Sequence, residues 1–106
     1  MSFRYMRMIL FFDLPTLTYS QRKSYQKFHK FLIKSGYIMM QESVYCKLAL
    51  NGSIVKSEKL KLEKNKPEEG LIQMLVVTEK QFSQMEYIIG NKQSQIEDSE
   101  KRIIII

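Results

Sequence analysis

The stretch MRMILFFDLP, residues 6–15, decides the fold of this chain. It is a nearly continuous apolar run that ends in one carboxylate, Asp13, shortly before the chain-breaking Pro15. Such a run predicts a strand that is covered on both faces of a sheet, or nearly so. Asp13 would then lie where the backbone pairing stops, so that a ligand could approach its side chain.

Asp13 is the only acidic residue among the first 35 positions, which carry seven lysines and arginines and a net charge of +6. The other 71 residues hold ten basic and ten acidic side chains, so their net charge is zero. The excess positive charge therefore lies in the first third of the chain, which indicates a directed electrostatic field rather than general solubility. A lone acid in these surroundings is either an ion-pair partner or a metal ligand.

A helix is predicted after this strand, running to about Ser35. Thr16 or Thr18 can cap its start, Thr18 and Gln21 have the spacing of a capping box, and Gly36 can supply the left-handed residue that ends it. Its apolar side carries Tyr25, Phe28, Phe31 and Leu32. The opposite side carries four lysines at spacings of four, three and four residues: Lys23, Lys27, Lys30 and Lys34.

These four lysines, here called the lysine stripe, have no acidic residue between them. Neighbouring ammonium groups on one helix face repel each other by roughly a few tenths of a kcal/mol per pair, which interleaved Glu or Asp normally relieves. A solvated helix face is one interpretation of the stripe. The other is a surface that tracks the phosphates of a duplex, with Arg22 beside it; binding would then be independent of base sequence and would weaken steeply with salt.

The rest of the chain predicts further strands and one more long helix. Residues 37–50 are rich in strand formers but too long for one straight strand, so we expect a bend near residues 41–43. Ser53 can cap a second, charge-rich helix that runs to about Lys64. The elements expected after it are a strand over 71–78, a short helix over 79–85, a short strand over 86–89, a linker over 92–99 and a terminal strand over 102–106.

This order of elements predicts an α+β chain with a ferredoxin-like, split βαβ fold and an antiparallel sheet. We expect residues 1–91 to form this single domain, and residues 92–106 to form a linker and a C-terminal strand. Four isoleucines at the end of the chain would be an aggregation hazard if they were left exposed. We therefore expect a homodimer in which this strand is exchanged or added across the interface.

The composition excludes several other classes of protein. No apolar run reaches the roughly 18 residues of a membrane span, and the N-terminus lacks the pattern of a signal peptide, so we expect a cytoplasmic protein with no membrane partner. The single cysteine, Cys46, allows no intrachain disulfide and is predicted to be a packing residue. The single histidine, His29, is expected at the helix surface or boundary rather than as a catalytic base.

Several short segments together resemble the family of CRISPR-associated protein two. They are FDLP at residues 12–15, GY at 36–37, QESVY at 41–45 and VTEKQF at 77–82. The opening RYMRM at residues 4–8 looks most like the versions that accompany type II-A systems. The resemblance covers nearly the whole chain, and it is the order and separation of the segments that make it specific.

The resemblance implies the small subunit of the CRISPR spacer-acquisition complex. This subunit would be a ferredoxin-like homodimer that bridges two dimers of the CRISPR integrase subunit and binds prespacer duplex DNA. The family is also assigned a magnesium-dependent endonuclease activity, in which Asp13 would be the catalytic residue and the metal ligand. One Mg²⁺ would be shared by Asp13 of both subunits, because a single chain offers only one carboxylate near this strand end.

Two alternatives remain open at this stage. Asp13 could have a structural role, pairing with Arg7 or capping the following turn, and Glu42 is only a distant candidate for a second acidic ligand. The function could instead be that of a metal-dependent endoribonuclease that acts alone on the same fold, as a toxin would. An RNA-recognition sheet lacks its aromatic motif here, and because the Tyr and Phe residues mostly have core spacing, we expect no platform for stacked bases.

Overall fold

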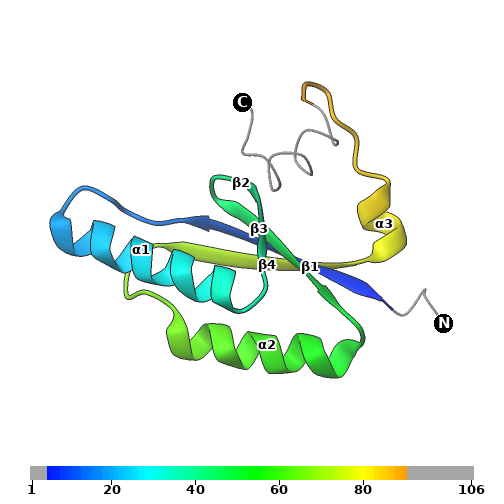
Figure 1. Cartoon of the computed structure of the whole chain (residues 1–106), viewed down its shortest axis with the longest axis horizontal. Helices are drawn as coiled ribbons and strands as arrows, with labels where there is room; N and C mark the ends of the chain where they lie inside the picture. The colour runs from blue at the N-terminus through cyan, green and yellow to red at the C-terminus, as the bar shows by residue number, and fades with distance from the viewer. Residues whose placement is uncertain (1–4, 91–106) are drawn as a thin grey trace.

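The computed structural model describes residues 5–90, which form one antiparallel sheet, two long helices and a short third helix (Figure 1). The central strand is β1 (Met6–Asp13), which pairs with β3 (Val44–Ala49) on one side and with β4 (Leu71–Thr78) on the other. β2 (Ile38–Gln41) borders β3, so the strand order is β2-β3-β1-β4. This topology confirms the predicted ferredoxin-like α+β fold.

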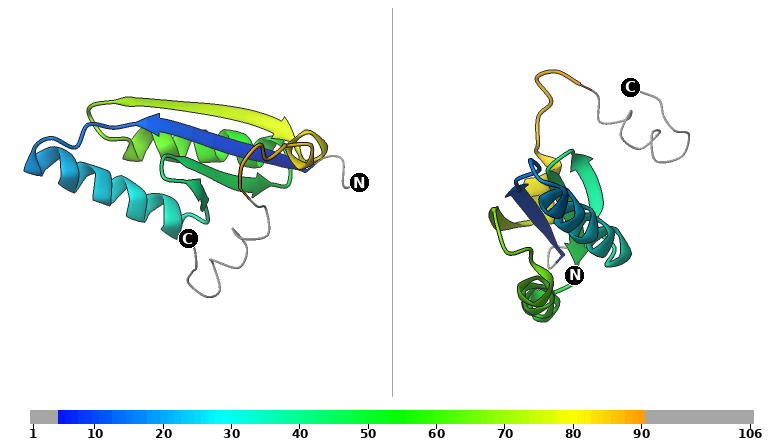
Figure 2. Two further views of the ribbon diagram at one scale, coloured as in Figure 1. Left: turned by 90° about the horizontal axis from the view of Figure 1, so that it is seen from above. Right: turned by 90° about the vertical axis from the view of Figure 1, so that its left-hand side faces the viewer.

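Two long helices, α1 (Tyr19–Lys34) and α2 (Gly52–Asn65), lie on the same face of the sheet (Figure 2, left). The Oγ1 of Thr18 accepts a hydrogen bond from the backbone N–H of Gln21, and the Oε1 of Gln21 accepts one from the backbone N–H of Thr18. Beyond the end of α1, Gly36 has a φ of 96°. The capping box and the left-handed glycine were therefore both predicted correctly.

The main core lies between the sheet and α1. Alternate residues of β1 face the helices, and among them Leu10 and Phe12 pack with Phe28 and Leu32 of α1. The ring of Phe12 stacks on that of Tyr45 at a centroid distance of 5.3 Å. The other face of β1 carries no long helix, so the expectation that the strand would be covered on both faces holds only in part within one chain.

Four local features differ from the sequence prediction or refine it. Asn51 rather than Ser53 caps α2, because its side-chain oxygen accepts the backbone N–H of Ile54 at 3.1 Å. Where a bend was predicted, the chain reverses completely in a turn at residues 42–43, which divides the segment into the antiparallel strands β2 and β3, and a register shift lies before it between Met39 and Gln41. The third helix, α3, is shorter than expected (Glu79–Ser83). Residues 86–89 form no strand, since none of them pairs with a neighbouring strand in the described part of the chain.

The predicted linker over 92–99 and the terminal strand over 102–106 lie outside the described residues. Within residues 5–90, no helix is both long and apolar enough to cross a membrane.

Candidate functional site

Asp13 is the last residue of β1, where its Cα is paired with that of Leu71 at the start of β4. Side chains alternate along a strand, so Asp13 lies on the same face as Arg7, Ile9 and Phe11, which is the face without α1 and α2. Its side chain is exposed, and among residues 5–90 its carboxylate forms no hydrogen bond or ion pair. Asp13 is therefore accessible and uncommitted.

The Arg7 side chain, considered above as a partner for Asp13, is engaged at the opposite end of the strand. Its Nε and Nη2 donate to the two carboxylate oxygens of Glu79 at 3.0 and 2.6 Å, and its guanidinium lies 4.3 Å from the ring centroid of Phe82. The hydrogen bond to Glu79 outweighs burial and raises the pKa of Arg7. Six residues of extended strand separate Arg7 from Asp13 by about 20 Å, so the alternative in which the two side chains pair does not hold.

The backbone around Asp13 is fixed by close packing of the chain segment that precedes β4. Gly70 has a φ of 111°, and a Cβ at this position would lie 2.6 Å from Leu14 Cδ2 and 2.9 Å from the Asp13 carbonyl oxygen. Only glycine allows both the left-handed conformation and this approach. The end of β1 is thus held by direct backbone contact with the start of β4.

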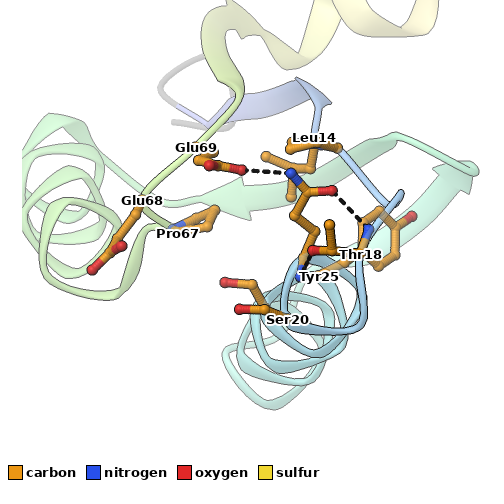
Figure 3. Close-up of a pocket in the computed structure, with 10 residues that line it drawn as sticks. Leu14, Thr18, Ser20, Tyr25, Pro67, Glu68 and Glu69 are labelled. Carbon is orange, nitrogen blue, oxygen red and sulfur yellow. Dashed lines mark hydrogen bonds between the residues drawn. The ribbon is translucent and has the colours of Figure 1, made fainter.

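A pocket of about 250 Å³ lies on the helix side of this strand end and is shown in Figure 3. Across it, the Gln21 amide donates to Glu69 Oε1 at 2.9 Å, while its oxygen accepts from the backbone N–H groups of Leu17 and Thr18. Gln21 therefore caps α1 and also ties the β1–α1 loop to the loop before β4. The second structural role considered for Asp13, capping the following turn, does not hold either, because its carboxylate accepts no hydrogen bond within residues 5–90, while Thr18 and Gln21 cap α1.

A magnesium site cannot be completed by the described residues of one chain. They contain no group of three or more His, Cys, Asp or Glu side chains that could hold a metal ion. Glu42 lies in the turn between β2 and β3 and is not part of any such group. Asp13 supplies a hard oxygen ligand of the kind that Mg²⁺ prefers, but the ion also needs ligands from a second chain, from substrate phosphate or from water.

The helix-free face of the sheet carries large exposed apolar side chains beside Asp13. Phe11 is 37% exposed, and Leu48, Leu75, Leu71 and Ile38 are more exposed still. In the strand pairing, each of these residues is aligned with a residue of a neighbouring strand whose side chain also lies on the helix-free face. Together they therefore form one surface. An apolar sheet face of this kind normally packs against another protein surface.

All four lysines of the stripe are exposed on α1, and none forms an ion pair with another residue of the described part of the chain. Lys23 to Lys34 spans eleven residues, or about 17 Å of helix. Arg22 lies beside the stripe, but its Nη1 donates to the backbone carbonyls of Thr16 and Leu17 at 3.3 and 3.0 Å. The structure thus brings the four lysines together and leaves their charges available.

A second set of exposed lysines, which the sequence did not single out, lies on α2. Lys56, Lys59 and Lys64 are exposed, and no ion pair involves them within residues 5–90. The charge balance of the sequence does not reveal these lysines, because the last 71 residues have no net charge. Helical spacing could have found it, since Val55, Glu58 and Leu62 share the buried side of α2 and leave the lysines outside.

Glu58 is the only charged residue that is buried within residues 5–90. Its Oε2 accepts hydrogen bonds from Lys47 at 2.9 Å and Lys61 at 3.4 Å, and its Oε1 accepts one from the Tyr37 hydroxyl. Burial alone would raise the pKa of Glu58, but hydrogen bonding to Lys47 and the charges of both lysines outweigh it and lower the pKa. Lys47 also donates to the Ser35 carbonyl, so this cluster joins α2, β3 and the end of α1.

The cysteine and the histidine have the structural surroundings that the sequence predicted. Cys46 is buried, and burial raises the pKa of its thiol despite the opposing effect of Arg7. His29 is half-buried at the edge of α1, where its Nδ1 hydrogen-bonds the Tyr45 hydroxyl. Burial, followed by the nearby Tyr25 and Glu42, raises the pKa of Tyr45 to about 12. Neither Cys46 nor His29 is a candidate for the reaction centre.

Comparison with known proteins gives a consistent result over most of the chain. Residues 6–85 match the family model described as "CRISPR associated protein Cas2". The chain is 50% identical over 105 residues to "CRISPR-associated endoribonuclease Cas2" of Treponema denticola, covering 95% of this chain and 100% of that protein. It is 48% identical over 101 residues to the protein of the same name from Streptococcus mutans strain UA159, covering 95% and 93%, respectively. The Streptococcus match is consistent with the resemblance to type II-A versions.

Proposed function

Because this chain belongs to the CRISPR associated protein Cas2 family, we propose that it acts in CRISPR spacer acquisition, as a dimeric scaffold for prespacer DNA. The observation that carries the proposal is the lysine stripe, whose four ammonium groups are exposed and unpaired within residues 5–90. The partners in the proposal are a second copy of the chain, two dimers of the integrase subunit and the DNA duplex, all located in the cytoplasm.

Binding of the duplex would depend on phosphate contacts. Lysines on one straight helix face can follow a phosphate backbone, and each contact releases condensed counterions into solution. A dimer doubles the number of lysines, and the exposed lysines of α2 would add to the positive charge. Such contacts position the duplex without reading its sequence, which suits a scaffold that must accept spacers of any sequence.

The helix-free face supports the proposed dimer. Its exposed apolar side chains would be buried if two sheets packed against each other, and burial of such surface is the main driving force of association. Asp13 lies on this same face. A twofold axis close to the ends of the β1 strands would therefore bring the two Asp13 carboxylates near one another.

We also propose a phosphodiester-cleaving site at Asp13, because its relatives are named endoribonucleases and its own carboxylate is uncommitted. In the dimer, the two Asp13 side chains would hold one Mg²⁺. Magnesium, when bound, supplies Lewis-acid polarisation of a phosphodiester and a more acidic water. The contribution of the protein is to hold the carboxylates at rigid strand ends, which Gly70 and the Gln21–Glu69 hydrogen bond fix in place.

Spacer integration in a system reconstituted with the integrase subunit tests the scaffold. Charge reversal of the four stripe lysines to Glu should abolish integration, while Asp13→Ala should abolish magnesium-dependent cleavage and leave integration intact. If charge reversal left integration unchanged, the stripe would be only a solvated helix face. Loss of integration in Asp13→Ala, with duplex binding retained, would show that the scaffold role depends on the carboxylate.

The alternative is an endoribonuclease that acts alone, and the names of the relatives favour it. It predicts RNA cleavage by the purified chain without the integrase subunit, and loss of cellular function in Asp13→Ala. Comparing this variant in both assays separates the two proposals, because only the stand-alone enzyme needs Asp13 for its biological role.

A further inference from the structure

A second cleft, of about 410 Å³, lies between α1 and the turn that joins β2 to β3. The residues that line it come from three segments: Leu14 and Thr16 of the loop between β1 and α1, Arg22, Tyr25 and Gln26 of the helix, and Glu42 and Ser43 of the turn. The volume falls within the range of small-molecule sites, at its lower end. Neither the lysine stripe nor Asp13 lines this cleft.

We infer that this cleft holds one unpaired nucleobase of a nucleic-acid strand bound at the end of β1. The inference rests on the proposed nucleic-acid function, and it adds a subsite for a single-stranded segment. Unpaired bases are bound by stacking on an aromatic or guanidinium plane, together with hydrogen bonds to the base edges. The cleft offers both kinds of contact.

Tyr25 supplies the aromatic surface. It was expected on the apolar side of α1, but it is only half-buried and lines both this cleft and the pocket of Figure 3. Its ring meets Phe12 edge-to-face, at 6.1 Å and 63°, and its hydroxyl donates to the Glu42 carbonyl at 3.4 Å. The ring is thereby fixed between the core and the turn, with part of its surface open to a ligand.

Gln26 and Glu42 supply groups that can bond to the edge of a base. Both are exposed, and neither side chain forms a hydrogen bond within residues 5–90. An amide can donate and accept, while a carboxylate accepts from ring N–H or exocyclic amino groups. These two groups enter the cleft from opposite sides, one from the helix and one from the turn.

Arg22 lies on the helix side of the cleft, and its orientation is set by the hydrogen bonds from Nη1 to the carbonyls of Thr16 and Leu17. A guanidinium carries five N–H donors, so others remain for a phosphate. Within residues 5–90 it forms no ion pair that would compete. Arg22 would therefore hold the phosphate attached to the bound nucleotide.

The cleft is joined directly to the strand that carries Asp13. The Ser43 carbonyl accepts the backbone N–H of Phe12 at 3.1 Å, and Leu14 lines the cleft wall. Asp13 lies between Phe12 and Leu14 on the chain. A base held here would lie at the same strand end as Asp13 but on the helix side of the sheet, opposite the face that carries the Asp13 side chain, while the lysine stripe continues along α1 away from it.

The test compares affinities for unpaired and paired strands. We would measure fluorescence anisotropy of labelled short single strands of RNA and of DNA, and of a duplex of the same sequence, in buffer without magnesium. The matched variants are Gln26→Ala/Glu42→Ala and Gln84→Ala/Glu86→Ala, which remove the same groups and charge at different places. The first should lower single-strand affinity about tenfold and leave duplex affinity within about twofold, while the second should change neither.

Two results would overturn the inference: an unchanged single-strand affinity in Gln26→Ala/Glu42→Ala, or an equal decrease for single strands and duplex. A second pair of variants tests stacking, since Tyr25→Phe should retain affinity for single strands and Tyr25→Leu should reduce it. If the wild type failed to bind duplex but bound single strands through the cleft, the scaffold proposal would fail while the inference stood. The RNA and DNA arms identify which strand supplies the base.

Discussion

The two ends of β1 carry opposite charges that are used in different ways. Arg7 at one end is held by both carboxylate oxygens of Glu79 and by the ring of Phe82. Asp13 at the other end has no hydrogen bond or ion pair within residues 5–90. The first charge fastens α3 to the sheet, whereas the second is available to a ligand.

The same difference separates the two sets of lysines. Lys47 and Lys61 are bound to the buried Glu58, which ties α2 to the sheet, whereas the lysine stripe on α1 has no acidic partner in the described part of the chain. A charge that is paired in the fold contributes to stability, and a charge that is exposed and unpaired is free for binding. We therefore expect substitutions of the two kinds to affect different measurements.

The largest effect is expected from the lysine stripe. Reversing all four lysines to Glu should weaken duplex binding by about a thousandfold, because attraction to phosphate is replaced by repulsion. Titration of a labelled duplex measures this. A matched pair of double variants provides the control: Lys27→Glu/Lys30→Glu should weaken binding much more than Lys66→Glu/Lys80→Glu. Equal decreases would mean that only net charge matters.

Asp13→Asn should lower magnesium-dependent cleavage by about a hundredfold or more, since an amide is a poor replacement for a metal-binding carboxylate. The free energy of unfolding should change by less than about 0.5 kcal/mol, because the Asp13 side chain has no partner to lose in the described fold. Rate measurements on RNA and DNA, together with denaturant unfolding, check both parts. Glu86→Gln is the control for cleavage. A clear decrease in stability would contradict the claim that Asp13, unlike Arg7, has no partner in the described fold.

Glu58→Gln should lower the free energy of unfolding by about 2 kcal/mol, because it removes the carboxylate that neutralises Lys47. Glu63→Gln removes the exposed pair with Lys66 on the same helix and should cost less than about 0.5 kcal/mol. Denaturant unfolding of both variants makes the comparison. Similar decreases would show that burial of Glu58 does not matter.

The pH dependence of this difference follows from the direction of the shift. The pKa of Glu58 is lowered in the fold, so its contribution is fully present above the ordinary glutamate pKa, about 4.3, and is lost as the pH falls through its folded value. The stability gap between the wild type and Glu58→Gln should therefore be constant near neutral pH and close on acidification. If the stability gap widened in acid, the pKa of Glu58 would not be lowered in the fold.

Arg7→Lys should lower the free energy of unfolding by about 1 kcal/mol, which is less than the effect of Glu58→Gln. It keeps the charge but cannot form the two-pronged hydrogen bond to Glu79 or stack in the same way on Phe82. Duplex binding should not change, because Arg7 is paired within the fold. Thermal unfolding and duplex titration of the same samples separate these two expectations.

Local sequence signals predicted the fold well. The apolar run of β1, the capping box at Thr18 and the left-handed Gly36 each determine structure through neighbouring residues, so they could be read without tertiary information. The prediction of a strand over 86–89 was wrong, because a short apolar segment does not form a strand unless it pairs with the edge of a sheet.

The site was less predictable because it depends on contacts between distant parts of the chain. Asp13 and the lysine stripe could be selected from sequence, since an isolated charge and a helical repeat are local patterns. The pairing of Arg7 with Glu79, 72 residues away, could not. The burial of Glu58 beneath Lys47 and the cleft between Tyr25 and Glu42 also became visible only in the folded chain.

The salt dependence of duplex binding tests the central claim most directly, namely that the unpaired lysines of α1 bind nucleic acid. Affinity should be measured across a range of salt concentrations for the wild type, for the stripe changed to Gln and for the stripe changed to Arg. Log affinity falls as log salt rises, and this dependence should become shallower by about 0.9 for each phosphate that the Gln variant no longer neutralises. In the Arg variant the slope should be the same as in the wild type. An unchanged slope in the Gln variant would contradict the claim.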